Sequence, residues 1–164
     1  MRAMPDTHTA NIRPVPTVEE GREIRELGHD ETHLAYRAIL DLGRSVRSKT
    51  EFVDRINVMR SEGYRLVASF EEGHEQAAAI IGFREGHNLA WGHYLYLDDV
   101  VTREDHRGRG HGGALMAWIE QEARSLGCDE IHCDSGLHRH DAHRLYLNSR
   151  MHLHSHHFGR KVTA

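Results

Sequence analysis

The sequence has few cysteines, no long hydrophobic run and no excess of basic residues. Its apolar stretches are too short for a membrane helix of about 20 residues, so we expect no membrane association. Residues 1–9 lack the apolar core of a signal peptide, so we expect a cytoplasmic protein. Cys128 and Cys133 are the only two cysteines, and in a reducing compartment we expect both to be free thiols.

The balance of charge excludes a further class of function. The chain has 21 basic and 25 acidic residues, with a net charge of −4. Because general nucleic-acid-binding proteins are normally basic, we expect no nucleic-acid partner. The 164 residues, 38% of them hydrophobic, are enough to bury the core of one domain. We therefore expect a flexible tail over residues 1–9 and a single domain over residues 10–164.

Hydrophobic periodicity predicts a mixed α/β protein. A short strand over 12–15 comes first, and a capping box of Thr17 and Glu20 predicts the start of a helix. A second helix is predicted to begin at Thr50. Further along, we expect strands over 64–70, 77–83 and 93–101 with turns at Gly73 and 86–88, a helix ended by Gly127, a strand over 130–134, a helix over 141–148 and a last strand over 153–162. This order favours an antiparallel meander followed by a parallel strand–helix–strand unit.

A glycine-rich loop joins the third strand of the meander to the amphipathic helix. It reads Arg107-Gly108-Arg109-Gly110-His111-Gly112-Gly113. Glycines let the backbone approach a ligand closely, and the first N–H groups of a helix have no internal partner. The helix dipole adds partial positive charge, so this loop predicts a site for an anionic phosphate. For the loop taken alone, a solvated helix N-terminus with flexible glycines is the alternative.

This loop and a second motif together resemble the GCN5-related N-acetyltransferase (GNAT) superfamily. The family signature is Arg/Gln-x-x-Gly-x-Gly/Ala, and Arg107, Gly110 and Gly112 fill its three fixed positions. Ala142 and Tyr146 match the family's Ala-x-x-x-Tyr helix further along the chain. The sequence departs from the family at Arg139, where asparagine is frequent, and at Arg150-Met151, where Gly-Phe is usual.

The resemblance implies a mixed, mostly antiparallel central sheet flanked by helices, with a cleft between the fourth and fifth strands. It implies acetyl-CoA as co-substrate, with the pyrophosphate against the backbone of Arg109 to Gly113. A primary amine, on a small molecule or a lysine side chain, would attack the thioester directly in a ternary complex. A homodimer is a family-level expectation. The residues expected to bind the cofactor are Val100, Val101, Arg107, Gly108, Arg109, Gly110, His111, Gly112 and Gly113.

The reaction needs a proton acceptor for the amine and a proton donor for the departing thiolate. The resemblance places the Tyr146 hydroxyl near the sulfur as the acid, and ordinary packing of the ring is the alternative. Asp98 and Asp99 end the third meander strand, and some polyamine acetyltransferases of the family carry acids there that relay the amine proton. Because adjacent strand residues face opposite sides, we expect one of the two to face the cleft. A solvated strand end or a salt bridge to an arginine is the alternative.

The acceptor is less well defined by the sequence. Residues 19–41 hold seven acids against three arginines, which would favour a cationic amine, although an ordinary solvated helix face is the alternative.

Histidine is unusually frequent, with 16 in the chain and eight of them between residues 132 and 157. His152, His154 and His156 would share one face of a strand, but no second group of ligands completes a familiar metal spacing, so we expect no metal site. Two other classes of function stay open. One is a non-catalytic acyl-CoA-binding sensor, and the other is a histidine-rich metal-binding protein on the same fold.

Overall fold

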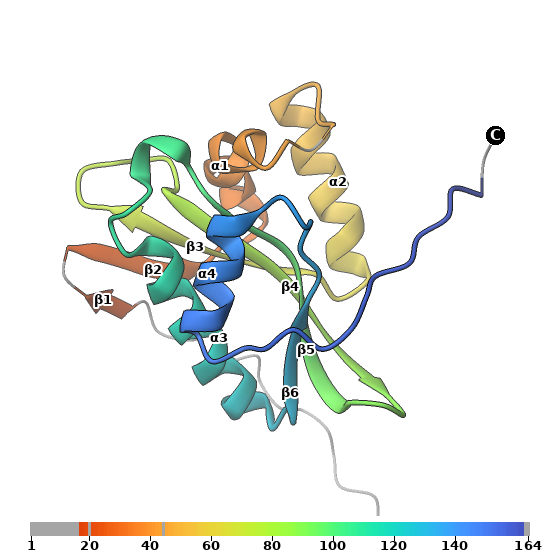
Figure 1. The fold of residues 1–164 in the computed structure, drawn as a ribbon. Coiled ribbons are helices and arrows are strands. Elements are labelled where there is room, and N and C mark those ends of the chain that lie inside the picture. Colours follow the sequence, from red (N-terminus) through yellow and green to blue (C-terminus); the bar gives the residue numbers. More distant parts are fainter. Residues whose placement is uncertain (1–16, 20, 44, 163–164) are drawn as a thin grey trace, which may run out of the picture.

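The computed structural model describes residues 17–19, 21–43 and 45–162, and a six-stranded sheet runs through its centre (Figure 1). The strands lie side by side in sequence order, and all neighbours are antiparallel except the last pair, which is parallel. They are β1 (Thr17–Glu19), β2 (Arg22–Glu26), β3 (Arg65–Glu71), β4 (Ala79–Asn88), β5 (Gly92–Thr102) and β6 (Glu130–Cys133). The predicted mixed, mostly antiparallel sheet is therefore confirmed.

Helices cover both faces of the sheet and form two hydrophobic cores. On one face, Leu66 and Ile80 pack with Phe52 of helix α2 (Lys49–Ser61), and on the other Val67 and Ile81 pack with Leu115 of helix α3 (His111–Leu126). This alternation follows from the two-residue period of a strand. The helices are η1 (His29–Ala35), α1 (Tyr36–Asp41), α2 (Lys49–Ser61), η2 (Glu104–His106), α3 (His111–Leu126) and α4 (His140–Asn148). No helix of the described residues is long and apolar enough to cross a membrane.

The predicted helix start at Thr17 is wrong. Residues 17–19 and 22–26 form strands β1 and β2, which are joined at Gly21 with a φ of +76°. The backbone of β2 pairs along β3 from Arg22↔Glu71 to Glu26↔Val67, and Ile24 is buried in the core under α3. Pairing between segments distant in the chain therefore overrides the local capping signal. The strand predicted over 12–15 and the division at residue 9 lie outside the described residues.

Three further features differ from the prediction: the start of α2, the end of β4 and the last predicted strand. Ser48, and not Thr50, caps α2, because its hydroxyl accepts a hydrogen bond from the Glu51 N–H at 3.1 Å. Strand β4 continues through residues 86–88, and the turn falls at 89–91 instead. The last predicted strand does not form, since residues 149–162 contain no helix or strand. Leu153, Phe158 and Val162 are all exposed, so this segment has no buried face to hold it against the sheet.

The parallel pair of strands separates part-way along β5. The β5–β6 ladder runs from Tyr94↔Glu130 to Leu97↔Cys133, whereas β5 continues to Thr102. No described strand pairs with the β6-side edge of residues 98–102. Helix α3 begins shortly after this unpaired stretch and ends at Leu126, and Gly127, with a φ of +74°, is its C-cap as predicted. The fold thus brings a helix N-terminus close to an open strand edge, at the cleft predicted between the fourth and fifth strands, which are β5 and β6.

Candidate functional site

The glycine-rich loop leads directly into α3. Gly108 and Gly110 have φ angles of +75° and +84°, a region that favours glycine, and Gly110 is the N-cap of α3. The first hydrogen bond of the helix runs from the Ala114 N–H to the Gly110 carbonyl at 3.0 Å. The N–H groups of residues 111–113 precede it, so the helix provides no acceptor for them. The guanidinium of Arg22 donates to the Arg109 carbonyl at 2.8 Å and holds the loop against β2.

The two loop arginines differ in their surroundings. Arg109 donates to both carboxylate oxygens of Glu71 at 2.8 Å and to the Asp105 carbonyl at 3.0 Å. The hydrogen bonds from Arg109 lower the pKa of the Glu71 carboxyl. The Arg107 side chain is exposed and has no ion pair with the rest of the described chain. Arg107 is therefore the arginine whose charge is available to a ligand at the start of α3.

His111 is turned away from solvent although it opens the helix. Its side chain is 1% exposed, and Nδ1 lies 2.8 Å from the Ser69 hydroxyl of β3. Burial lowers the pKa of this imidazole. Among the residues predicted to bind a cofactor, His111 can therefore contribute its backbone N–H, while its ring belongs to the protein interior.

A β-bulge places both predicted acids on one face of the sheet. The β4–β5 register changes from Gly82↔Asp99 to Phe83↔Leu97, so Asp98 has no partner across the ladder. Arg84 donates two hydrogen bonds to Asp98, at 2.9 and 2.6 Å, and Arg84 follows Phe83, which packs on the α3 side. Asp99 accepts a hydrogen bond from Tyr64, a residue of the core on the opposite, α2 side.

The expectation that Asp98 and Asp99 face opposite sides is therefore wrong, because it assumed a regular strand. Both carboxylates lie on the side of α1 and α2. Asp98 does form the salt bridge to an arginine that was the alternative for this position.

Tyr64 and Gly82 were missed by the sequence analysis. The Tyr64 ring is 2% exposed and crosses β4 at Gly82 to reach Asp99 at 3.1 Å. A Cβ atom at Gly82 would lie 1.7 Å from the Tyr64 hydroxyl oxygen, so only glycine leaves room for the ring. Burial, reinforced by Asp99, raises the pKa of Tyr64 well above its ordinary value. No local sequence signal links these residues, because the contact joins the residue before β3 to β4 and β5.

Tyr146 lies on α4, as predicted, and contacts the end of β6. Tyr146 and Cys133 both pack against the core under α3, and Cys133 belongs to the last pair of the β5–β6 ladder. Burial raises the pKa of Tyr146 and raises that of Cys133 to about 11, so both groups are protonated at neutral pH. The protonated Tyr146 hydroxyl thus lies near the point where β5 and β6 separate.

Helix α4 is held close to this point from two sides. Leu145 packs over Gly112 of α3, where a Cβ atom would lie 3.2 Å from a Leu145 methyl group. Arg139, at the position where the GNAT pattern often has asparagine, donates to the Leu42 carbonyl at 3.0 Å. These contacts connect α4 to α3 and to the segment that ends α1, on either side of the open strand edge.

The sequence profile of the acetyltransferase (GNAT) family matches residues 29–150. The chain belongs to this family. An uncharacterized N-acetyltransferase, YhdJ from Bacillus subtilis strain 168, is 32% identical over 90 residues, which are 55% of this chain and 62% of YhdJ. The matched part is thus less than two thirds of that relative.

Solved structures of this family share the fold at low identity. Glucosamine-6-phosphate N-acetyltransferase from Arabidopsis thaliana superposes with a TM-score of 0.71 at 19% identity, covering 88% of this chain and 100% of that one. AAC(6')-Iy in complex with the bisubstrate analog CoA-S-monomethyl-acetylneamine gives a TM-score of 0.69 at 13% identity, covering 87% and 99%.

Proposed function

We propose that this protein is an acetyl-CoA-dependent N-acetyltransferase that acetylates a primary amine of a small molecule or of a lysine side chain. The observation that carries the proposal is the arrangement at the separation of β5 from β6. Among the residues that the structure describes, three features lie around that point: a strand edge that no other strand pairs with, helix N–H groups that have no acceptor within the helix, and Tyr146. Membership of the GNAT family and the curated relative YhdJ support the same activity.

The pyrophosphate of the cofactor would bind at the start of α3. The backbone N–H groups of residues 109–113 supply the donors, and the helix dipole adds favourable potential. The exposed Arg107 adds a full charge. Gly108, Gly110, Gly112 and Gly113 keep side chains out of the approach, and Gly113 has no neighbouring atom within 4 Å of its Cβ position.

The pantetheine and the thioester would lie along the unpaired edge of β5. The backbone groups of Val100 and Val101 on that edge are the donors and acceptors for the pantetheine amides, and their side chains pack into the two cores. The pantetheine would thus take the place that β6 leaves beyond Leu97.

The amine would approach from the side of α1 and α2, where the bulge directs Asp98 and Asp99. A neutral amine attacks the carbonyl carbon of the thioester, and its proton passes through water towards these carboxylates. When the tetrahedral intermediate collapses, the C–S bond breaks and the Tyr146 hydroxyl donates a proton to the leaving thiolate. The named acceptor of the Arabidopsis neighbour, glucosamine-6-phosphate, supports a small amine as substrate.

An acceptor screen that detects the thiol of released CoA tests this proposal. We expect thiol release above the hydrolytic background with at least one class of amine, among polyamines, amino sugars and lysine peptides. Mass spectrometry should then find the acetyl group on the amine nitrogen. Tight binding of acetyl-CoA without turnover of any amine would instead identify an acyl-CoA sensor.

A further inference from the structure

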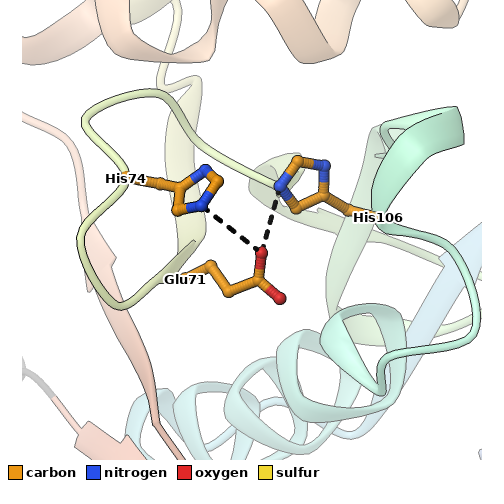
Figure 2. Close-up of side chains that lie close together, drawn as sticks. All are labelled: Glu71, His74 and His106. Atoms are coloured by element: carbon orange, nitrogen blue, oxygen red, sulfur yellow. Dashed lines mark ion pairs between the residues drawn. The ribbon is translucent and has the colours of Figure 1, made fainter.

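A group of potential metal ligands lies beside the glycine-rich loop, although the residues are far apart in the sequence. Glu71 ends β3, His74 lies in the turn to β4, and His106 ends η2. Figure 2 shows both imidazole rings turned towards the Glu71 carboxylate, with both dashed lines meeting at one oxygen. The Nε2 atoms of His106 and His74 lie 3.3 and 3.9 Å from Glu71 Oε2, and the three ligand atoms are within 4.8 Å of one another.

His106 is oriented as a ligand by its own second partner. Its Nδ1 lies 2.7 Å from an oxygen of Asp105, and its Nε2 faces Glu71 on the other side of the ring. A carboxylate at the other ring nitrogen is the usual way in which proteins fix the tautomer of a metal-binding histidine. The ring is 4% exposed, and its Nε2 makes no hydrogen bond within the described part of the chain. A divalent cation bound between this nitrogen and the Glu71 carboxylate, which lie 3.3 Å apart, would give both atoms a partner.

His111 presents the same pattern on the other side of Glu71. Its Nδ1 is satisfied by Ser69 at 2.8 Å, while its buried Nε2 has no hydrogen-bond partner among the described residues and lies 4.0 Å from Glu71 Oε1. Two buried imidazoles thus direct an unsatisfied nitrogen at one carboxylate. Because buried polar atoms are normally hydrogen-bonded, two such nitrogens at one place indicate a missing partner.

We propose that Glu71, His74 and His106 bind a divalent transition-metal ion, with Zn²⁺ as the best fit. Imidazole nitrogen and carboxylate oxygen suit zinc, whereas calcium and magnesium prefer sets of oxygen ligands. In a tetrahedron with bonds of 2.0–2.1 Å the ligand atoms are roughly 3.4 Å apart, close to the observed 3.3 and 3.9 Å. Three protein ligands leave the fourth position for water or for a small shift of His111.

The neighbouring arginine is compatible with this metal site. Arg109 donates to both oxygens of Glu71. If Oε2 bound the metal, Arg109 would keep its hydrogen bond to Oε1. A hydrogen-bonded ligand carboxylate is typical of metal sites. The metal would then join the β3–β4 turn to the segment before α3 and fix Glu71, which holds Arg109. The proposal goes beyond the acetyltransferase activity, and it differs from the sequence prediction that the chain binds no metal.

The test uses full-length protein without a tag, stripped with a chelator and titrated with Zn²⁺ in competition with a chromophoric chelator. We expect one tight site per chain, a higher melting temperature with Zn²⁺, and with Co²⁺ the visible absorption of a tetrahedral ion. Glu71→Gln and His74→Ala should each weaken Zn²⁺ binding by at least about tenfold. His74 is half exposed, so its replacement leaves the fold intact, as circular dichroism of the metal-free protein would verify.

The control is the triple variant His152→Ala, His154→Ala and His156→Ala, which removes exposed histidines of the C-terminal segment. It should keep the tight site and the Co²⁺ spectrum. Unchanged Zn²⁺ affinity in both site variants, loss of the site in the triple variant, or no tight site in the wild type would each overturn the proposal.

Discussion

The two halves of strand β5 share one backbone but have different surroundings. Residues 92–97 pair with β4 on one edge, and from Tyr94 to Leu97 with β6 on the other. In the second half, residues 98–102, Asp98 lies in the bulge, and residues 99–102 pair with β4 and with no other strand of the described chain. Leu95 and Leu97 in the first half are completely buried under α3. The first half therefore provides stability, whereas the second half carries the backbone groups and acids that we propose face the substrates.

The largest effect should come from the paired half. Leu95→Ala removes a side chain that is 0% exposed and leaves a cavity under α3, so we expect unfolding to require about 2–5 kcal/mol less. Urea denaturation followed by circular dichroism measures this change. Turnover per folded molecule should be unaffected well below the midpoint of unfolding. If Leu95→Ala lowered turnover without lowering stability, the paired half of β5 would not have the purely stabilising role described here.

Removal of the Tyr146 hydroxyl should have the next largest effect. Tyr146→Phe keeps the ring on α4 and removes only the proton donor, so we expect kcat to fall on the order of 10²-fold with little change in acetyl-CoA affinity. The matched control is Tyr94→Phe in the paired half of β5, whose ring packs edge-on against Trp91. If both variants turn over at the wild-type rate when chemistry is limiting, Tyr146 is a packing residue.

Gly82→Ala tests the contact between Tyr64 and Asp99. The new Cβ would lie 1.7 Å from the Tyr64 hydroxyl oxygen, so the buried ring must move and the hydrogen bond to Asp99 is lost. We expect a destabilisation of about 1–3 kcal/mol, as for overpacking of a core. Gly113→Ala is the control, since its Cβ position has no neighbour within 4 Å and its φ is ordinary. Equal melting temperatures for the two variants would show that Tyr64 does not lie across Gly82.

The smallest effect should come from the charge of Arg107. Arg107→Glu places a negative charge beside the predicted pyrophosphate, and we expect the KM for acetyl-CoA to rise on the order of tenfold at low salt, with less effect at high salt. Arg124→Glu changes an exposed arginine near the other end of α3 and should leave KM unchanged. If the two variants had equal KM values for acetyl-CoA at low salt, Arg107 would not lie beside the bound cofactor.

Gly110→Val, the obvious substitution in the glycine-rich loop, is unsuitable as a test of binding. The φ of +84° at Gly110 is strained for any other residue. A loss of cofactor binding in this variant could therefore not be distinguished from a loss of folding.

The parts of the site that the sequence predicted are those with local signals. The glycines before α3, the C-cap at Gly127 and the position of Tyr146 on α4 all depend on residues within a few turns of one another. The bulge at Asp98 and the contact of Tyr64 with Asp99 depend on strand register, which links residues up to 35 positions apart. Residue propensities contain no information on that register, so the predicted orientation of Asp98 and Asp99 was wrong.

The histidines show the same limit. The C-terminal histidines are neighbours in the sequence but lie exposed in a segment without a helix or strand. His74 and His106 are 32 residues apart and meet at Glu71 only because the β3–β4 turn lies beside η2. Convergence of side chains is a property of the fold, and spacing along the chain predicts it only within a single helix or strand.

A crystal structure with acetyl-CoA bound tests the central claim most directly. It should show the pyrophosphate on the N–H groups of residues 109–113 and the thioester beside the unpaired edge of residues 98–101, with the Tyr146 hydroxyl facing the sulfur. If the cofactor instead lay away from the start of α3, or if β6 closed against residues 98–102 in the complex, the account given for the second half of β5 would be contradicted.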